Sequence, residues 1–351
     1  MADLTREDLR AAVAAGYLTE AQAANVLALA QTRAGTRIPE DEPFELFRGF
    51  AEIFVAVGLS ILFLGAFGFL QLIGRPALLS GLCAVLAWGL ARYYTLKRRM
   101  MLPSIVLVLV YGAGVLGMFG VLIWRQYGLS HGTTEPAALV LVATGLALLA
   151  WFRVFRLPFS MFLVGLTGLA LVLVVTRTLI PGVGFGDYTD AFDLRHGSGL
   201  AFGTLAFGLI AFVVAMSFDM RDPHRLGRTA ASGFWLHLLA APALVNTVAL
   251  TFWNMGPGLG YGLLAAALAL ISVLALVIDR RSFLTAGIGY LIFLVAYVAG
   301  GPGDPRSWAW VLLLTGLGLT LLGTYWTALR ARLMRALPDF PGKRRLPPYA
   351  E

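Results

Sequence analysis

Residues 53–73 read IFVAVGLSILFLGAFGFLQLI, and none of them is charged. About 20 consecutive apolar residues are enough for one helical crossing of a lipid bilayer. Similar apolar stretches follow one another, with only short polar breaks, as far as Arg330 in this chain of 351 residues. The sequence therefore predicts an all-α fold, a polytopic bundle of transmembrane helices.

The composition excludes a soluble globular protein. Hydrophobic residues make up 59% of the chain and charged residues 13%, whereas roughly a quarter of the residues in soluble domains are charged. The formal net charge is +8, but the basic residues lie in short loops between apolar stretches, where membrane topology accounts for them. We expect the lipid bilayer to be the main partner and expect no nucleic-acid partner.

About ten spans fit the apolar pattern. Assigning the loops to alternate sides places all but five of the 27 Lys and Arg residues on the side of the amino terminus. Cytoplasmic loops carry such an excess of basic residues. The five on the other side are Arg75, Arg125, Arg177, Arg195 and Arg306. The span centres lie near Leu62, Val85, Gly114, Thr144, Gly168, Gly208, Leu239, Leu268, Phe293 and Gly318.

The charge pattern predicts that both chain ends lie in the cytoplasm. The polar residues before the first span do not resemble a secretory signal. The excess of arginine over lysine fits a GC-rich bacterial genome, so we expect a bacterial inner membrane protein. Several tryptophans, including Trp151 and Trp326, fall near expected span ends, as in the aromatic belts at membrane interfaces.

Residues 1–37 predict a cytoplasmic helical hairpin. Thr5 followed by Asp8, and Thr19 followed by Gln22, have the spacing of capping boxes at two helix starts. Apolar residues on the two helices can pack together or bind a cytoplasmic protein: Leu9, Val13, Val26, Leu27 and Leu29. The other expected segments are an acidic, Pro-bounded linker over 38–47, the transmembrane bundle over 48–330 and a basic cytoplasmic tail over 331–351.

The seventh span carries the main candidates for a polar pathway. Polar groups inside a bilayer are costly, so an ionisable residue such as His237 is a candidate for function. Pro242 follows five residues later and interrupts the helical hydrogen bonds. Asn246 is a third candidate, although its spacing from His237 places it on nearly the opposite helix face. The alternative is that His237 bonds a neighbouring helix and Pro242 shapes the bundle.

Glu52 is the fourth pathway candidate, at the start of the first span. Glu45, Arg48 and Glu52 share one helix face, so the alternative is a solvated turn held by salt bridges. The most charged loop between spans offers three candidates for contact with lipid headgroups or a partner: Arg221, Arg225 and Arg228. Such a loop also serves simply as a topology anchor.

No cofactor, metal or catalytic residue is predicted. Cys83 is the single cysteine, and the four histidines fall at different depths, so neither a metal nor a haem site is expected. Motifs such as Gly-x-Ser-x-Gly and His-Glu-x-x-His are missing from the sequence. The glycine-rich segment 182–187 lacks the Gly-Lys-Ser/Thr ending of a phosphate-binding loop.

The amino-terminal region carries a family resemblance. Leu9, the run Gly16-Tyr17-Leu18-Thr19-Glu20-Ala21-Gln22, and Arg48 leading into Val57-Gly58-Leu59 form its pattern. The chain resembles an uncharacterised bacterial family of predicted polytopic membrane proteins, a domain of unknown function with an amino-terminal helical hairpin. The resemblance covers roughly the first seventy residues; it implies the topology and transfers no binding or catalytic residue.

Three functions follow as hypotheses. The first is a permease or channel-like protein for a small neutral or lipid-like solute, because the spans carry little charge and the seventh has a polar, proline-containing centre. The second is a membrane scaffold or regulator that binds a cytoplasmic protein through residues 1–37. The third is an intramembrane enzyme acting on lipid. The Gly-x-x-x-Gly motif over 199–203 can also support an oligomer.

Overall fold

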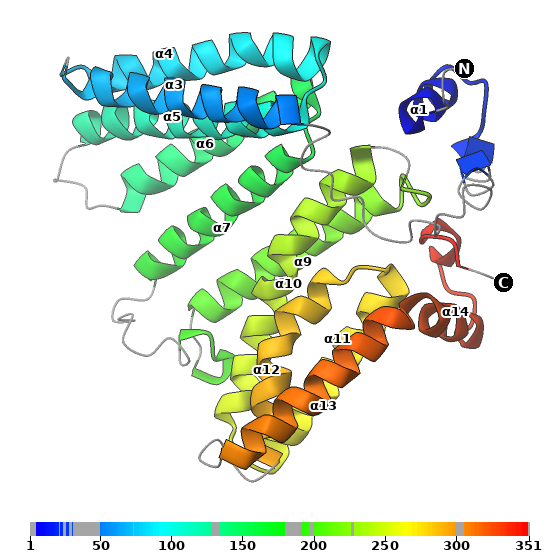
Figure 1. The fold of residues 1–351 in the computed structure, drawn as a ribbon. Helices are drawn as coiled ribbons and strands as arrows, with labels where there is room; N and C mark the ends of the chain where they lie inside the picture. The colour runs from blue at the N-terminus through cyan, green and yellow to red at the C-terminus, as the bar shows by residue number, and fades with distance from the viewer. Residues whose placement is uncertain are drawn as a thin grey trace. The chain divides into compact units, whose positions relative to one another are not determined.

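The computed structural model describes residues 5–20, 22–23, 26–27, 30, 50–72, 74–127, 134–179, 191–196, 199–225, 228–298 and 305–349. This part of the chain is helical and contains no strand (Figure 1), which confirms the predicted all-α fold class. The expected linker over 38–47, together with Glu45 and Arg48, lies outside the described residues.

The helices are those of a multi-pass membrane protein. Within the described residues, eight helices are long and apolar enough to cross a membrane, and a pair bent by 70° raises the number to nine if it forms one span. One further apolar helix, α12, has 17 residues. Each of the expected span centres falls inside a separate helix.

The chain divides into two compact units. Unit 1 comprises Met1–Pro43, Phe185–Ala201 and Gly208–Glu351, and unit 2 comprises Phe44–Gly184 and Phe202–Phe207.

Unit 2 contains consecutive apolar helices, of which α3, α4 and α5 lie side by side (Figure 1). The closest approach is between α4 and α5, where a Cβ atom on Gly114 would lie 2.6 Å from the carbonyl oxygen of Ser80. Only glycine allows the two backbones to come this near. The helices are α3 (Phe50–Leu72), α4 (Pro76–Ala91), the π-helical turn η1 (Arg92–Lys97), α5 (Met101–Tyr127), α6 (Thr134–Phe155) and α7 (Phe159–Leu179).

The core of unit 2 is aromatic. Trp151 is fully buried, with ring centroids 4.4 Å from Phe155, 4.8 Å from Tyr111 and 5.5 Å from Trp88. The expectation that Trp151 belongs to an interfacial belt is therefore wrong, because its ring fills the space between α4, α5 and α6. Trp326, in unit 1, is likewise buried.

Unit 1 is built around α10, which packs against α11, α12 and η3. Among the eight long apolar helices of the described residues, α10 is the most buried: 56% of its most apolar stretch lies inside the protein, against 22% to 33% in the other seven. The elements are α1 (Arg6–Ala14), η3 (Leu194–His196), α9 (Gly199–Asp219, with Phe202–Phe207 counted in unit 2), α10 (Arg228–Asn254), α11 (Leu259–Ile278), α12 (Ser282–Val298), α13 (Pro305–Thr324), α14 (Trp326–Ala336) and η4 (Lys343–Arg345).

The amino-terminal capping boxes are confirmed. Thr5 caps α1 together with Asp8, and Thr19 and Gln22 exchange the two expected hydrogen bonds. The described residues between 20 and 30 are helical. Leu9 and Ala23 are buried together, and Val13, Leu18 and Leu27 pack against them. Val26 is exposed, and Leu29 lies outside the described residues.

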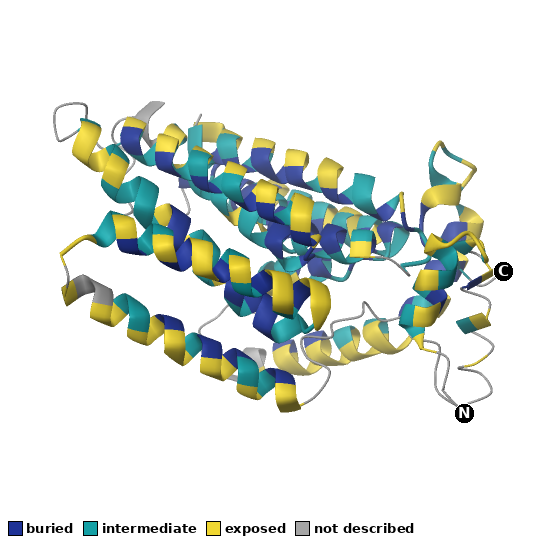
Figure 2. Cartoon of the chain, turned by 90° about the horizontal axis from the view of Figure 1, so that it is seen from above, coloured by how far each residue is buried: buried dark blue, intermediate teal, exposed yellow. Residues whose placement is uncertain are grey.

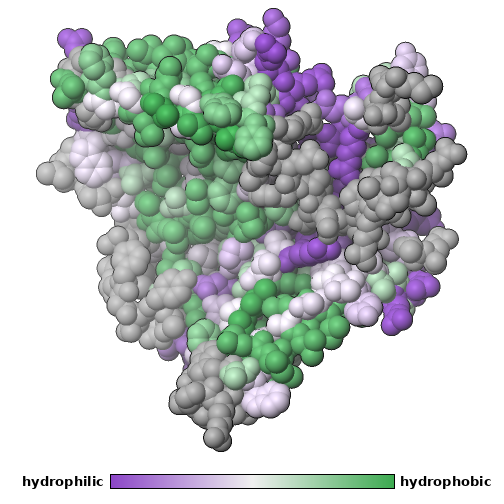
Figure 3. Space-filling model, viewed as in Figure 1, coloured by the Kyte–Doolittle hydropathy of each residue, from purple (hydrophilic) through white to green (hydrophobic). Residues whose placement is uncertain are grey.

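Exposed side chains on the long helices are largely apolar. Buried and exposed residues alternate along most helices in Figure 2, as expected where one face packs on neighbours and the other faces lipid. On α3, Phe54 and Leu64 expose more than two thirds of their surface, at 75% and 71%. Figure 3 shows the resulting apolar surface over α3, α4 and α5.

Candidate functional site

A buried ion pair at one end of unit 1 fastens α9 and α10 to the α11–α12 turn. Arg280 donates to both carboxylate oxygens of Asp219, from Nε at 3.0 Å and from Nη2 at 2.5 Å. Nη2 also donates to the carbonyl oxygen of Ala230, at 2.9 Å. His237 Nε2 lies 3.0 Å from Asp219 Oδ2. We call Asp219, His237 and Arg280 the Asp219 cluster; all three are at most 3% exposed.

Aromatic rings enclose the imidazole of this cluster. The rings of Phe212 on α9 and Phe283 on α12 lie 5.6 Å and 5.8 Å from that of His237. An apolar enclosure strengthens the electrostatic attraction within the cluster and raises the cost of breaking it. The arrangement holds a titratable ring beside a neutralised ion pair.

Gly233 allows Asp219 to approach α10. A Cβ atom at Gly233 would lie 2.5 Å from Asp219 Oδ1 and 3.0 Å from the carbonyl oxygen of Ala215. Real Cβ contacts are not this short, so a larger residue would push α9 and its terminal carboxylate away from α10. Glycine at position 233 therefore allows Asp219 to reach His237 and Arg280.

A second polar cluster adjoins the first along the chain. Asp279, in the left-handed conformation with φ of 57°, ends α11. Its carboxylate lies 3.0 Å from Arg225 Nη1 and accepts a hydrogen bond of 2.7 Å from the Trp326 indole nitrogen. Arg330 Nε lies 3.8 Å away and donates to the carbonyl oxygen of Leu276 at 3.1 Å. We call Asp279, Arg225, Trp326 and Arg330 the Asp279 cluster.

A third cluster lies at the other end of α10. Asp193 is fully buried and accepts hydrogen bonds from Arg195 Nη2 at 2.6 Å and Asn254 Nδ2 at 3.2 Å. Burial tends to raise the pKa of Asp193, but the hydrogen bonds from Arg195 and Asn254 outweigh it, so the pKa lies below its usual value. Next to it, the Leu194 amide donates to Thr251 Oγ1 at 3.1 Å. Asp193, Arg195 and Asn254 form the Asp193 cluster.

Between these clusters, α10 makes a further polar contact. Asn246 is half-buried, and its side-chain oxygen accepts a hydrogen bond from the hydroxyl of Tyr290 on α12. Pro242 is exposed, and α10 continues through it from Arg228 to Asn254. His237 and Asn246 thus contact different partners at two levels of the helix, and Pro242 lies on an outer face.

Glu52 belongs to unit 2 and has its partners there. Its carboxylate accepts hydrogen bonds from the backbone amides of Met101 at 3.1 Å and Leu102 at 3.3 Å. These amides open α5 and have no partner within the helix, so Glu52 caps α5 from α3. The structure does not bring Glu52 together with the polar residues of α10 in one unit.

The three loop arginines differ in their surroundings. Arg221 and Arg228 are exposed, whereas Arg225 is half-buried. The guanidinium of Arg225 contacts both the carboxylate and the backbone carbonyl oxygen of Asp279. Contact with lipid or a partner remains a hypothesis for Arg221 and Arg228.

Sequence reasoning did not identify Asp219, Arg280 and Arg330 as buried, nor Asp279 as the partly buried partner of Arg225. Asp219 and Arg280 are 61 residues apart, and each stands next to a basic loop that is typical of a solvated span end. The sequence feature that could have indicated the cluster is Gly233, one helical turn before His237. A glycine at this position leaves room beside His237 for a side chain from another helix, here Asp219. Among the described residues, no group of three or more His, Cys, Asp and Glu side chains is placed to hold a metal ion.

Comparison of the chain with known protein families, curated proteins and solved structures finds no match.

Proposed function

We propose that this membrane protein is a permease or channel-like protein for a small neutral or lipid-like solute. The observation that carries the proposal is that hydrogen bonds hold α10 to its neighbours at both ends, in the Asp219 cluster and in the Asp193 cluster. The contact of Asn246 with Tyr290 lies between them. We infer that a solute pathway runs beside this polar middle and that one of these clusters closes it at each end.

The solute class follows from the groups that α10 offers. Residues 229–253 contain no charged side chain, and the carboxylates at both ends are already engaged by arginine. The polar groups between these ends are the amide of Asn246, the imidazole of His237 and hydroxyls on α10, with the phenol of Tyr290 on α12 beside Asn246. Such groups recognise neutral hydrogen-bonding molecules. A charged solute would lack a counter-charge in this region and would pay a large desolvation penalty.

Gating requires the Asp219 cluster to open. Because it joins α9, α10 and the α11–α12 turn, opening separates three elements together. His237 and Arg280 bond the same carboxylate, so the gate opens only when Asp219 leaves both partners.

Flux into proteoliposomes tests the proposal. Vesicles containing the protein would be mixed with glycerol, erythritol or sorbitol in a stopped-flow light-scattering assay, and a fluorescent short-chain lipid would test the lipid-like class. We expect flux above that of empty vesicles, reduced in Asn246→Leu and retained in Thr320→Val. Thr320 is a matched polar control because it is exposed on α13.

Wild-type flux equal to that of empty vesicles for all the probes would contradict the permease proposal. Equal loss in the Asn246 and Thr320 variants would contradict the assignment of the pathway to α10.

The second candidate is a membrane scaffold or regulator. It is favoured by the amino-terminal hairpin, which buries Leu9 against Ala23 yet leaves Tyr17 82% exposed and Val26 39% exposed. Such residues can contact a cytoplasmic protein. If this role holds, deletion of residues 1–37 will change the cellular phenotype while leaving flux unchanged; an unaltered phenotype argues against it.

The topology and family remain proposals of the same kind. We infer a bacterial inner membrane protein with both ends in the cytoplasm, related to the uncharacterised family that its first seventy residues resemble. The support is the gathering of basic residues at alternate loops. A reporter fused after Glu351 that is active only outside the cytoplasm would overturn this topology.

A further inference from the structure

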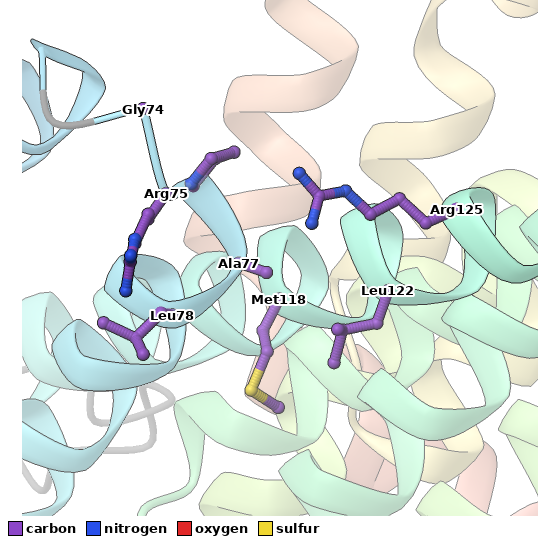
Figure 4. A pocket seen from close by; sticks show the side chains of 8 residues that line it. Gly74, Arg75, Ala77, Leu78, Met118, Leu122 and Arg125 are labelled. Atoms are coloured by element: carbon purple, nitrogen blue, oxygen red, sulfur yellow. The ribbon is translucent and has the colours of Figure 1, made fainter.

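A cavity of 570 Å³ opens in unit 2 where the α3–α4 turn meets the end of α5. Its wall combines two arginines with apolar side chains, as Figure 4 shows: Gly74, Arg75, Pro76, Ala77, Leu78, Met118, Leu122 and Arg125. The Arg125 guanidinium extends toward Ala77, and Arg75 runs along the start of α4 near Leu78 (Figure 4). Cationic groups thus border a largely apolar hollow.

The wall of the cavity is held by close packing between α4 and α5. Gly81 lies against Met118, whose sulfur would be 2.8 Å from a Cβ atom at that position, and Gly117 lies against Ser80. Pro76 begins α4 directly after Arg75. Backbones that approach this closely have little freedom to shift, so the cavity is formed before any ligand enters.

The charges of the cavity stand out against the rest of the topology. In the topology proposed above, only five basic residues fall on the side opposite the amino terminus, and two of them, Arg75 and Arg125, line this one cavity. Arg195 is another of the five and is neutralised by Asp193. Arg75 and Arg125 are exposed and have no hydrogen-bonding or ion-pair partner among the described residues. They are therefore available to an anion.

We propose that this cavity binds the phosphate of an anionic phospholipid. Arginine recognises phosphate through paired hydrogen bonds, and the positive end of the α4 dipole adds to the attraction. Both arginines lie near helix ends, which is the depth of lipid headgroups. Leu78 and Leu122 are 63% and 48% exposed and would accompany the first part of an acyl chain. This site is independent of the proposed pathway along α10.

Native mass spectrometry tests the site with full-length protein. Wild-type protein in detergent would be mixed with equal amounts of phosphatidylglycerol and phosphatidylcholine that carry the same acyl chains. We expect preferential retention of phosphatidylglycerol. Replacing each arginine should weaken this preference about fivefold, and Arg75→Gln with Arg125→Gln about thirtyfold.

The matched control is Arg92→Gln with Arg153→Gln. Arg92 and Arg153 are exposed and lie in the same unit, at the helix ends away from Arg75 and Arg125. The two substitutions change the net charge by the same amount as the Arg75 and Arg125 double variant. This control should keep the preference for phosphatidylglycerol, and equal melting temperatures would show that both double variants are folded.

Three results would overturn the proposal. The preference could survive in the Arg75 and Arg125 double variant, or it could fall equally in the control, which would make it a net-charge effect. Glycerol phosphate or inorganic phosphate could displace phosphatidylglycerol at equal concentration, which would show that the acyl chain contributes nothing and that the ligand is a soluble phosphate.

Discussion

Removing one side of the Asp219–Arg280 pair should strongly destabilise the protein. In Arg280→Met, the carboxylate of Asp219 loses its two hydrogen bonds from the guanidinium, of 3.0 Å and 2.5 Å, and keeps the contact with His237. The carboxylate stays buried at 3% exposure. Breaking a buried pair in this way costs about 3–5 kcal/mol, and Asp219→Leu should cost a similar amount because it leaves a buried arginine.

The double variant, Asp219→Leu with Arg280→Met, separates this explanation from simple loss of packing. With both charges gone no unpaired ion remains, and the main cost is the lost acceptor of His237, about 1–3 kcal/mol. The double variant should therefore be more stable than either single variant. The coupling energy from the cycle should be at least about 3 kcal/mol.

Stability would be measured by titrating dodecyl maltoside micelles of the protein with sodium dodecyl sulfate and following tryptophan fluorescence. Asp339→Asn serves as the control, because Asp339 is 90% exposed in its 3.5 Å contact with Lys343; it should change stability by less than about 0.5 kcal/mol. Single variants that cost under 1 kcal/mol, or strictly additive effects in the double variant, would refute the assignment of a buried, coupled pair.

Three further predictions concern other parts of the fold. The pKa of Asp193 is lowered in the folded state, so its charged form contributes stability above about pH 4, and this stability is lost as the pH falls toward the folded pKa. In Asp193→Asn, the melting temperature should therefore depend less on pH between 6 and 3 than in the wild type. An unchanged dependence would count against the cluster. Gly114→Ala should cost about 1–3 kcal/mol by forcing α4 and α5 apart, whereas Gly120→Ala on the same helix meets open space and should not destabilise; equal melting temperatures would contradict the close packing. Glu52→Ala should cost about 1 kcal/mol by uncapping α5, and more than Glu135→Ala, whose side chain is exposed; the reverse order would exclude the cap.

Hydrophobicity was sufficient to place the helices. The centres expected near Leu62 and Gly318, and all those between them, fall within separate helices because a span needs only a long apolar run, which is a local property of the sequence. The capping box of Thr5 and Asp8 was predictable for the same reason, since its two residues are neighbours on one helical turn.

The polar clusters were not predictable in this way. A charged residue at a span end looks solvated unless its distant partner is known, and Asp193 and Asn254 are 61 residues apart, as are Asp219 and Arg280. Trp151 was assigned to the interface from its position near a span end, but three-helix packing decided its burial. Pairing between elements is a tertiary property, and local periodicity does not encode it.

The contacts of Arg330 affect how the protein should be handled. Its guanidinium donates to the carbonyl oxygens of Pro347 at 2.5 Å and Pro348 at 3.0 Å, while its Nε faces the end of α11. One buried side chain thus ties the last described residues to the turn that carries Asp279 and Arg280. A purification tag or the topology reporter is therefore best joined after Glu351 through a long flexible linker, so that these contacts of Arg330 are kept.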